Sequence, residues 1–214
     1  FGGTVRSEAV GFSIGSKGYI GTGKDGTGYK NDFWEYNPVS DTWSPKTNFP
    51  GAIRGEATGF SIGNKGYIGM GVNWGSFIDY KDFWEWDQGT DTWTRKADLP
   101  DTPRHAAPGF SIGTKGYLGT GHTITSGNYT AFWEWNQSTD VWTQKADVGG
   151  TPMELAVGFS IGCKGYIGAG IPYTNEFWEY YDSTNNIFCS VLSVNISSQN
   201  ILCNSQCTGT GTAT

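Results

Sequence analysis

The two histidines are the first residues to consider for catalysis. His105 follows Arg104 just before a predicted strand, and His122 opens a loop of variable sequence. Nothing in the sequence brings a Ser-His-Asp or a Cys-His set together around either ring. We therefore expect no catalytic residue. A plain surface role is open for both histidines, and a ligand-binding role is open for His122.

A second candidate for chemistry is the segment 21–26, Gly-Thr-Gly-Lys-Asp-Gly, which matches the glycine spacing of dinucleotide-binding loops. That motif works only when a helix follows, because the helix N-terminus holds the pyrophosphate. Here a Gly- and Tyr-rich loop leads into another predicted strand. A zinc site is not expected either, because the single Cys-x3-Cys, Cys203 to Cys207, has no histidine cluster to complete it. We expect neither cofactor nor metal.

The elements that must position any site come from an internal repeat. The string Gly-Phe-Ser-Ile-Gly occurs four times, followed each time by Lys-Gly-Tyr-(Ile/Leu)-Gly-x-Gly and Phe-Trp-Glu-(Tyr/Trp). Three copies then end on Asp-x-Trp, while the fourth has Asn186-Ile187-Phe188. The phenylalanines of the first string are Phe12, Phe60, Phe110 and Phe159.

Each unit predicts four short antiparallel strands and no helix. Val10, Phe12 and Ile14 alternate with small residues, which is the period of a strand. The next residues form a tight turn with glycine in its last place, and the segment 33–36 is aromatic on both faces. Four strands repeated at intervals near 50 residues are typical of β-propeller blades.

The residues of the repeat also resemble the kelch motif in its usual order: Arg6, the pair Gly21 and Gly23, residues 31–38, and Asp41-Thr42-Trp43. The resemblance covers 1–189 and implies an all-β, kelch-type propeller with four four-stranded antiparallel blades. Their approximate bounds are 1–46, 47–96, 97–145 and 146–189.

Kelch propellers usually have six or seven blades, so the resemblance implies that further blades lie upstream. A small four-bladed ring is the alternative. An open arc would expose aromatic faces on its end blades and favour self-association.

Binding is expected in the loops that differ between units, at 24–32, 72–82, 122–131 and 171–176. Each joins the same two strands of its blade, so all should project from one face. A rigid scaffold that carries variable aromatic loops is typical of binding proteins. A purely space-filling role of these aromatics is the alternative. The candidate ligand-binding residues are Tyr29, Trp74, Phe77, Tyr80, His122, Tyr129 and Tyr173, with Arg54 and Arg104.

The two arginines belong to a set that recurs with the repeat, as do several glutamates. Because a residue present in every blade is expected to be structural, we predict that these arginines bond loop carbonyls or acids of neighbouring blades. A charged ring at one mouth of the channel is the functional alternative. The recurring residues are Arg6, Arg54 and Arg104; Glu35, Glu85, Glu134 and Glu179; and Glu8, Glu56 and Glu154. We also expect Trp34, Trp84, Trp133 and Trp178 to be largely buried.

Composition limits the partners. The 20 acidic and 14 basic residues give a net charge of −6, which disfavours nucleic acid and anionic membranes. No run of 18 apolar residues is present to span a bilayer. Segment 190–214 has neither charged nor aromatic residues, and it is expected to be a linker or the start of a following surface repeat domain.

An even number of cysteines in a Trp- and Gly-rich β protein suits an oxidising, exported location. Disulfides Cys203–Cys207 and Cys163–Cys189 are hypotheses, with free thiols as the alternative. We expect a secreted or cell-surface, bacterial-type protein that binds a glycan or a protein without catalysis. The alternatives are a carbohydrate-active kelch enzyme, of the sugar-oxidase or sialic-acid-isomerase sort, and a structural spacer.

Overall fold

The computed structural model describes residues 1–182, and all regular secondary structure in that range is β-strand. Four antiparallel sheets follow one another along the chain, so the predicted all-β, four-bladed propeller is confirmed. Three sheets have four strands; the fourth has three within the described range. The expected last strand near Phe188, and the segment 190–214, lie outside the described residues.

The blades are named in chain order. Blade 1 contains β1 (Val10–Ile14), β2 (Lys17–Gly21), β5 (Phe33–Asn37) and β6 (Thr42–Lys46). Blade 2 contains β7 (Thr58–Ile62), β8 (Lys65–Gly69), β11 (Phe83–Asp87) and β12 (Thr92–Lys96). Blade 3 contains β13 (Gly109–Ile112), β14 (Lys115–Gly119), β17 (Phe132–Asn136) and β18 (Val141–Lys145). Blade 4 contains β19 (Val157–Ile161), β20 (Lys164–Gly168) and β21 (Phe177–Tyr181).

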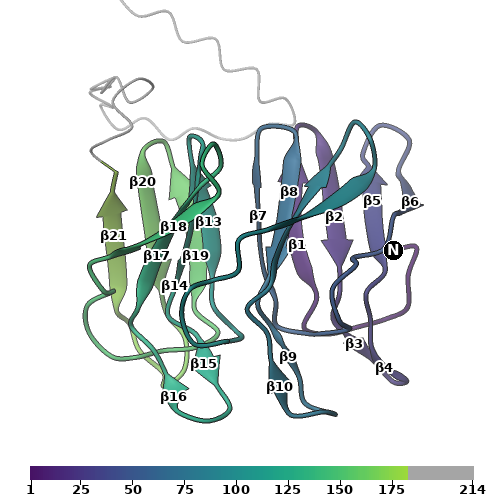
Figure 1. The fold of residues 1–214 in the computed structure, drawn as a ribbon. Helices are drawn as coiled ribbons and strands as arrows, with labels where there is room; N and C mark the ends of the chain where they lie inside the picture. The colour runs from purple at the N-terminus through teal and green to yellow at the C-terminus, as the bar shows by residue number, and fades with distance from the viewer. Residues whose placement is uncertain (183–214) are drawn as a thin grey trace, which may run out of the picture.

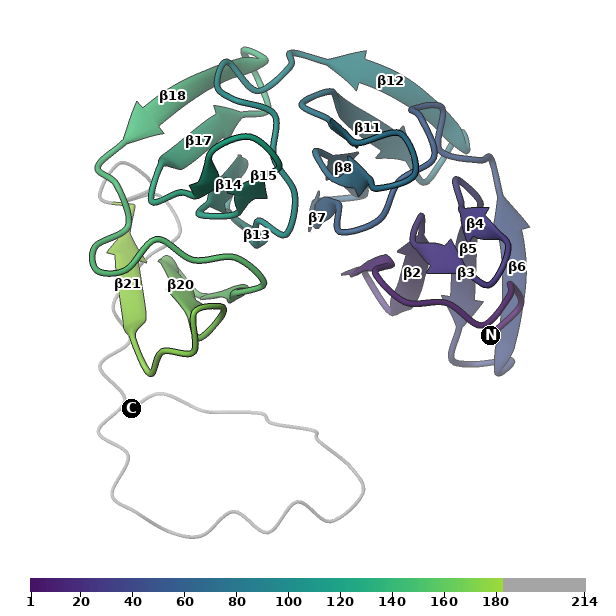
Figure 2. The ribbon, with the colours of Figure 1, turned by 90° about the horizontal axis from the view of Figure 1, so that it is seen from below.

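The blades stand side by side around a common axis, with blades 1 and 4 at the two ends of an arc (Figure 2). The first strands β1, β7, β13 and β19 line the inside and contact one another in that order. A chain of backbone hydrogen bonds also follows the inside: Glu56 N–H donates to Glu8, Ala106 N–H to Glu56, and Leu155 N–H to Ala106, each at 3.0 Å. Each of these four residues has a positive φ between 52° and 59°. The same local backbone geometry therefore links each blade to the next.

Packing between blades follows the repeat. A phenylalanine in the first strand of each blade covers a glycine in the second strand of the next, so that a Cβ at Gly66, Gly116 or Gly165 would collide with Phe12, Phe60 or Phe110, respectively. Aromatic rings extend this contact outward: Trp86 lies 5.0 Å from both Tyr19 and Phe33 of the preceding blade. Each blade thus presents one aromatic face and one glycine-lined face, and successive faces are complementary.

The expected burial of the four strand tryptophans is only partly correct. Trp133 is buried, Trp34 and Trp84 are half-buried, and Trp178 is 40% exposed. In blade 2 the ring of Phe49 packs edge-on against Trp84 at 6.2 Å. The corresponding place in blade 4 holds only Val148 followed by glycines, and a cavity of about 190 Å³ lies beside Trp178.

A search of residues 1–182 finds no helix that is long and apolar enough to cross a membrane.

Candidate functional site

The variable loops form short hairpins that project from one end of the propeller (Figure 1). They are β3 (Lys24–Asp25) with β4 (Gly28–Tyr29), β9 (Val72–Asn73) with β10 (Ile78–Asp79), and β15 (His122–Thr123) with β16 (Gly127–Asn128). Asp25 and Asn73 close the first two turns, because each side-chain oxygen accepts backbone N–H groups two and three residues later. We call this end the loop face.

The aromatic candidates divide into exposed and structural residues. Trp74, Phe77 and Tyr173 are 37%, 72% and 96% exposed, and a ligand can reach them from the loop face. Tyr29 is buried, and its hydroxyl accepts a long 3.4 Å hydrogen bond from the backbone N–H of Trp74. It therefore supports the Trp74 turn from below.

Tyr80 and Tyr129 instead pack on the two candidate arginines. The guanidinium carbon of Arg54 lies 4.1 Å from the centre of the Tyr80 ring, and that of Arg104 lies 4.6 Å from Tyr129. Both arginines are fully buried. In this structure neither offers a surface to a ligand.

Arg54 bonds inside its own blade. It donates to Asp82 at 2.6 and 2.9 Å and to the carbonyls of Met70 and Ala52. Burial alone would raise the pKa of Asp82, but the hydrogen bonds and charge of Arg54 outweigh burial, and the pKa is lowered. Arg6 makes the same contact with Asp32.

Arg104 differs because Ala131 stands where blades 1 and 2 have that aspartate. It pairs with Asp101 instead, three residues before it, and bonds the carbonyl of Thr120. Burial lowers the pKa of this guanidinium, against the opposing effect of Asp101. The arginines thus bond loop carbonyls, as expected, but their acids come from their own blade.

The register of the four blades places different residues at one equivalent position. Isolated bridges join Ser7 to Lys24, Gly55 to Val72, His105 to His122, and Glu154 to Ile171. Glu154 is thus the counterpart of His105, and its expected equivalence with Glu8 and Glu56 is wrong by one residue. Met153 replaces the repeated arginine in blade 4 and removes the landmark that would set the alignment. Blades 3 and 4 carry ionisable side chains where blades 1 and 2 have small residues.

His105 is the centre of this asymmetry. Its ring is buried, with Nδ1 2.6 Å from Asp79 Oδ1 of the blade 2 hairpin and Nε2 3.6 Å from Glu56 Oε2. Asp79 is held in place by the hydroxyl of Thr123 and the backbone N–H of Ile124, which both donate to Oδ2. Blades 2 and 3 therefore both contribute to one buried polar contact.

His122 and Trp74 complete the arrangement. The His122 ring lies 5.1 Å from His105, and its Nδ1 is 2.7 Å from Asn128 Oδ1 and 3.8 Å from Glu154 Oε2. The Trp74 ring meets the other side of His105 edge-on at 5.2 Å. We call the set of Glu56, Trp74, Asp79, His105, His122 and Glu154 the mouth cluster.

The mouth cluster adjoins the central channel. A cavity of about 510 Å³ is lined by the inner segments of all four blades, at residues 8–11, 56–59, 106–109, 155–156 and 158. Glu8 and Glu56 face it at the end that carries the hairpins. Burial raises the pKa of Glu56, and the charges of Glu8 and Glu154 raise it further, while His105 acts in the opposite direction. This mouth is rich in oxygen acceptors.

Part of this site was missed by sequence reasoning. Trp74 and His122 were candidate binding residues, and Glu56 and Glu154 were named only for the alternative of a charged ring at the channel mouth. Asp79 was not assigned to a site, and the surface role considered for His105 is wrong, because its side chain is buried. The available signal was the position of His105 opposite Gly55 and Ser7 in the repeat, which marks a departure from the structural pattern. Among the described residues no group of three or more His, Cys, Asp or Glu side chains is suited to hold a metal ion.

Comparison with known proteins defines the class by its fold. No family model matches the chain, and no curated protein matches it. Among solved structures, that of YjhT is similar, with a TM-score of 0.70 and 18% identity over 79% of this chain. The aligned part spans 60% of YjhT, and identity at this level shows the fold alone. The chain is a four-bladed β-propeller.

Proposed function

We propose that this propeller is a kelch-type, non-catalytic binding module that holds a glycan at the mouth cluster. The kelch assignment is supported by the motif order of the repeat and by the similarity to YjhT, a propeller of kelch type. The observation that carries the binding proposal is the pairing of a partly exposed indole, Trp74, with the buried His105 and its acidic neighbours at one channel mouth.

This combination fits a sugar ring. The apolar C–H face of a pyranose packs on an exposed indole, while its hydroxyl groups need fixed acceptors and donors. Glu56 and Glu154 supply carboxylate oxygens, and the imidazole of His122 can donate or accept. Phe77 and Tyr173 are further exposed aromatic residues of the variable loops.

Charge narrows the class of glycan to neutral or basic sugars. The mouth carries several carboxylates, and the nearby Arg54 and Arg104 are buried and paired within the blades. A sialylated or sulfated glycan would meet carboxylates without an exposed guanidinium to balance them. The same charge argument disfavours nucleic acid.

An exported or surface location belongs to the same proposal. Cys163 is disulfide-bonded, which is typical of proteins in oxidising compartments. The hypothesised partners, Cys189 for this residue and Cys203 with Cys207 for the second bond, lie outside the described residues. The small share of charged residues and the aromatic variable loops suit an extracellular binding module.

A catalytic role is the second candidate, because His105 is hydrogen-bonded to Asp79 and lies near a carboxyl group, Glu56, whose pKa is raised. Paired ionisable groups at a cavity are a common sign of acid–base chemistry. The burial of His105 argues against catalysis. Its Nε2, the ring nitrogen that is not bonded to Asp79, faces Glu56 rather than the channel. We therefore favour binding over turnover.

The test is a glycan array with the intact chain, followed by calorimetry on the best neutral ligand. We expect Trp74→Ala and Glu154→Gln each to weaken binding at least about tenfold, through loss of stacking and of a hydrogen bond. Tyr181→Ala, which removes an exposed tyrosine far from the hairpins, is the matched control and should bind normally.

Other outcomes separate the alternatives. A ligand set made only of sialylated glycans would contradict the charge argument. Chemical conversion of the bound sugar, followed by NMR, would establish the enzyme instead. Binding of a protein but no glycan would support the loop face as the binding surface and identify the ligand as a protein. No binding at all would favour a structural spacer.

A further inference from the structure

We propose that two copies of this chain associate head to tail, with the aromatic face of blade 4 in one copy packed on the glycine-lined face of blade 1 in the other. This contact would repeat between copies the interface that already joins the blades within the chain. It is separate from the mouth cluster and does not depend on the proposed function.

The aromatic face of blade 4 is uncovered, unlike its equivalents. Phe60 and Phe110 are each 4% exposed, whereas Phe159, at the same position of the repeat, is 41% exposed. Likewise Phe83 is fully buried and Phe177 is 56% exposed. Val157 and Ile161 belong to the same strand and are also exposed. Removing such a set of apolar side chains from water favours association.

The face that would cover them is uncovered at the other end of the arc. Gly18 occupies the position of Gly66, Gly116 and Gly165, each of which is filled by a phenylalanine of the preceding blade. At Gly18 no such ring is present: a Cβ there would meet only Tyr36, at 3.7 Å. Gly11 is open in the same way, while its counterpart Gly59 is closed by Val10. Blade 1 therefore presents a place shaped for a phenylalanine, and blade 4 presents the phenylalanine.

Polar groups at the two ends match as well. Along the inside of the arc, the N–H of Glu56, Ala106 and Leu155 each bonds the carbonyl of its counterpart in the preceding blade. In this pattern the N–H of Glu8, at one end of the arc, and the carbonyl of Leu155, at the other end, have no adjacent blade to bond within residues 1–182. Their bonding between copies would continue the chain of hydrogen bonds without a change of geometry.

The occupant follows from this continuity. The exposed surface of blade 4 matches a blade with glycines at the positions of Gly11 and Gly18, and a second copy of this chain supplies that surface. Such a contact uses different patches on the two copies, so it closes into a ring or extends into a longer assembly according to the rotation between them.

The experiment measures the mass of the intact chain by sedimentation and by light scattering after gel filtration. The wild-type protein is expected to exceed the mass of one chain at micromolar concentration. Gly18→Ala should weaken association by about tenfold or more, because the added methyl group would meet the incoming Phe159. Its melting temperature should stay unchanged, since the space at Gly18 is open within one copy. Phe159→Ser should also yield single chains.

Mixing the two variants gives a sharper result. The Gly18→Ala copy keeps an intact blade 4 face, and the Phe159→Ser copy keeps an intact blade 1 face, so one productive contact returns and a two-chain species should reappear. The control, Gly26→Ala in a hairpin turn where a Cβ meets nothing within 4 Å, should associate like the wild type. A wild-type protein that stays a single chain would overturn the proposal. So would an assembly that neither variant weakens, because its contact would then lie elsewhere.

Discussion

Gln137 of blade 3 donates a 2.7 Å hydrogen bond from Nε2 to the hydroxyl of Tyr67 in blade 2, and that hydroxyl donates in turn to Glu85 at 2.8 Å. Gln88 makes the same bond to Tyr19, one blade earlier, at 2.6 Å. Because the Tyr67 hydroxyl accepts one hydrogen bond and donates another, it holds the two sheets together and also sets the distance between them. Burial is the main cause that raises the pKa of Tyr67, and the hydrogen bond to Glu85 adds to it.

This relationship predicts an energetic coupling between blades. Tyr67→Phe and Gln137→Ala should each destabilise the fold, and the double variant should lose less than the sum by about 0.5–1.5 kcal/mol, because one shared hydrogen bond is lost once. Urea unfolding of the four proteins measures the difference. Tyr67→Phe combined with Gln144→Ala, an exposed glutamine of the same blade, should be additive.

Glycine at the blade interface predicts a cost for the smallest side chain. Gly116→Ala should destabilise the protein by about 1–3 kcal/mol, because the methyl group would collide with the Phe60 ring. The free energy of unfolding in urea provides the measurement. Equal stability of Gly116→Ala and Gly26→Ala would show that the rings are not in contact with the backbone of the next blade.

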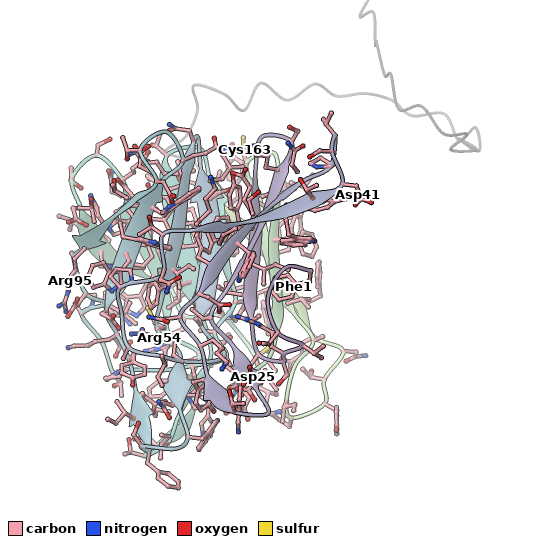
Figure 3. All side chains as sticks on the ribbon, turned by 90° about the vertical axis from the view of Figure 1, so that its right-hand side faces the viewer. Phe1, Asp25, Asp41, Arg54, Arg95 and Cys163 are labelled. Atoms are coloured by element: carbon pink, nitrogen blue, oxygen red, sulfur yellow. The ribbon has the colours of Figure 1, made fainter. Side chains whose placement is uncertain are left out.

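The buried Arg54 predicts a large loss. Arg54→Met should cost about 3–5 kcal/mol, because Asp82 would keep a charge without its partner in a largely buried place. Arg95→Met is the matched control: its partner Asp98 is on the surface, and the expected loss is below about 1 kcal/mol. Figure 3 shows the difference, with Arg95 at the edge of the molecule and Arg54 inside it.

Glu56 predicts a dependence of stability on pH. Its pKa in the folded state is raised above the ordinary 4.5, so between these two values the folded state binds more protons than the unfolded state. The contribution of Glu56 to stability therefore falls as pH rises from 4.5 through the raised pKa. We expect the free energy of unfolding of Glu56→Gln, relative to the wild type, to be more favourable at pH 7 than at pH 4. A difference that is constant with pH would contradict the raised pKa.

The fold could be predicted because the sequence of one blade is repeated four times. The alternation around Phe12 and the glycines that follow it indicate the strands and the contact between blades, and the structure places them so. The mouth cluster could not be predicted in full, because it depends on contacts between blades. Asp79 and His105 are 26 residues apart and meet only when two hairpin-bearing blades stand side by side.

The candidate binding residues show a second limit of the sequence. Tyr29 and Trp74 are both aromatic residues of variable loops, yet Tyr29 is buried and Trp74 is partly exposed in the structure. The variable loops differ in length and sequence, so the repeat gives no register there and does not indicate which of their aromatic residues is buried. The arginines illustrate the reverse case, because their recurrence in the repeat correctly indicated a structural role.

The sequential contacts between blades also shape how the molecule opens. Within residues 1–182 the strand contacts between blades join neighbours in the chain, so the stability of this array is close to a sum of units and junctions. Blades 2 and 3 have two junctions, while blades 1 and 4 have one. Amide protons in the middle of the arc are then released slowest into heavy water, and fraying starts from its ends.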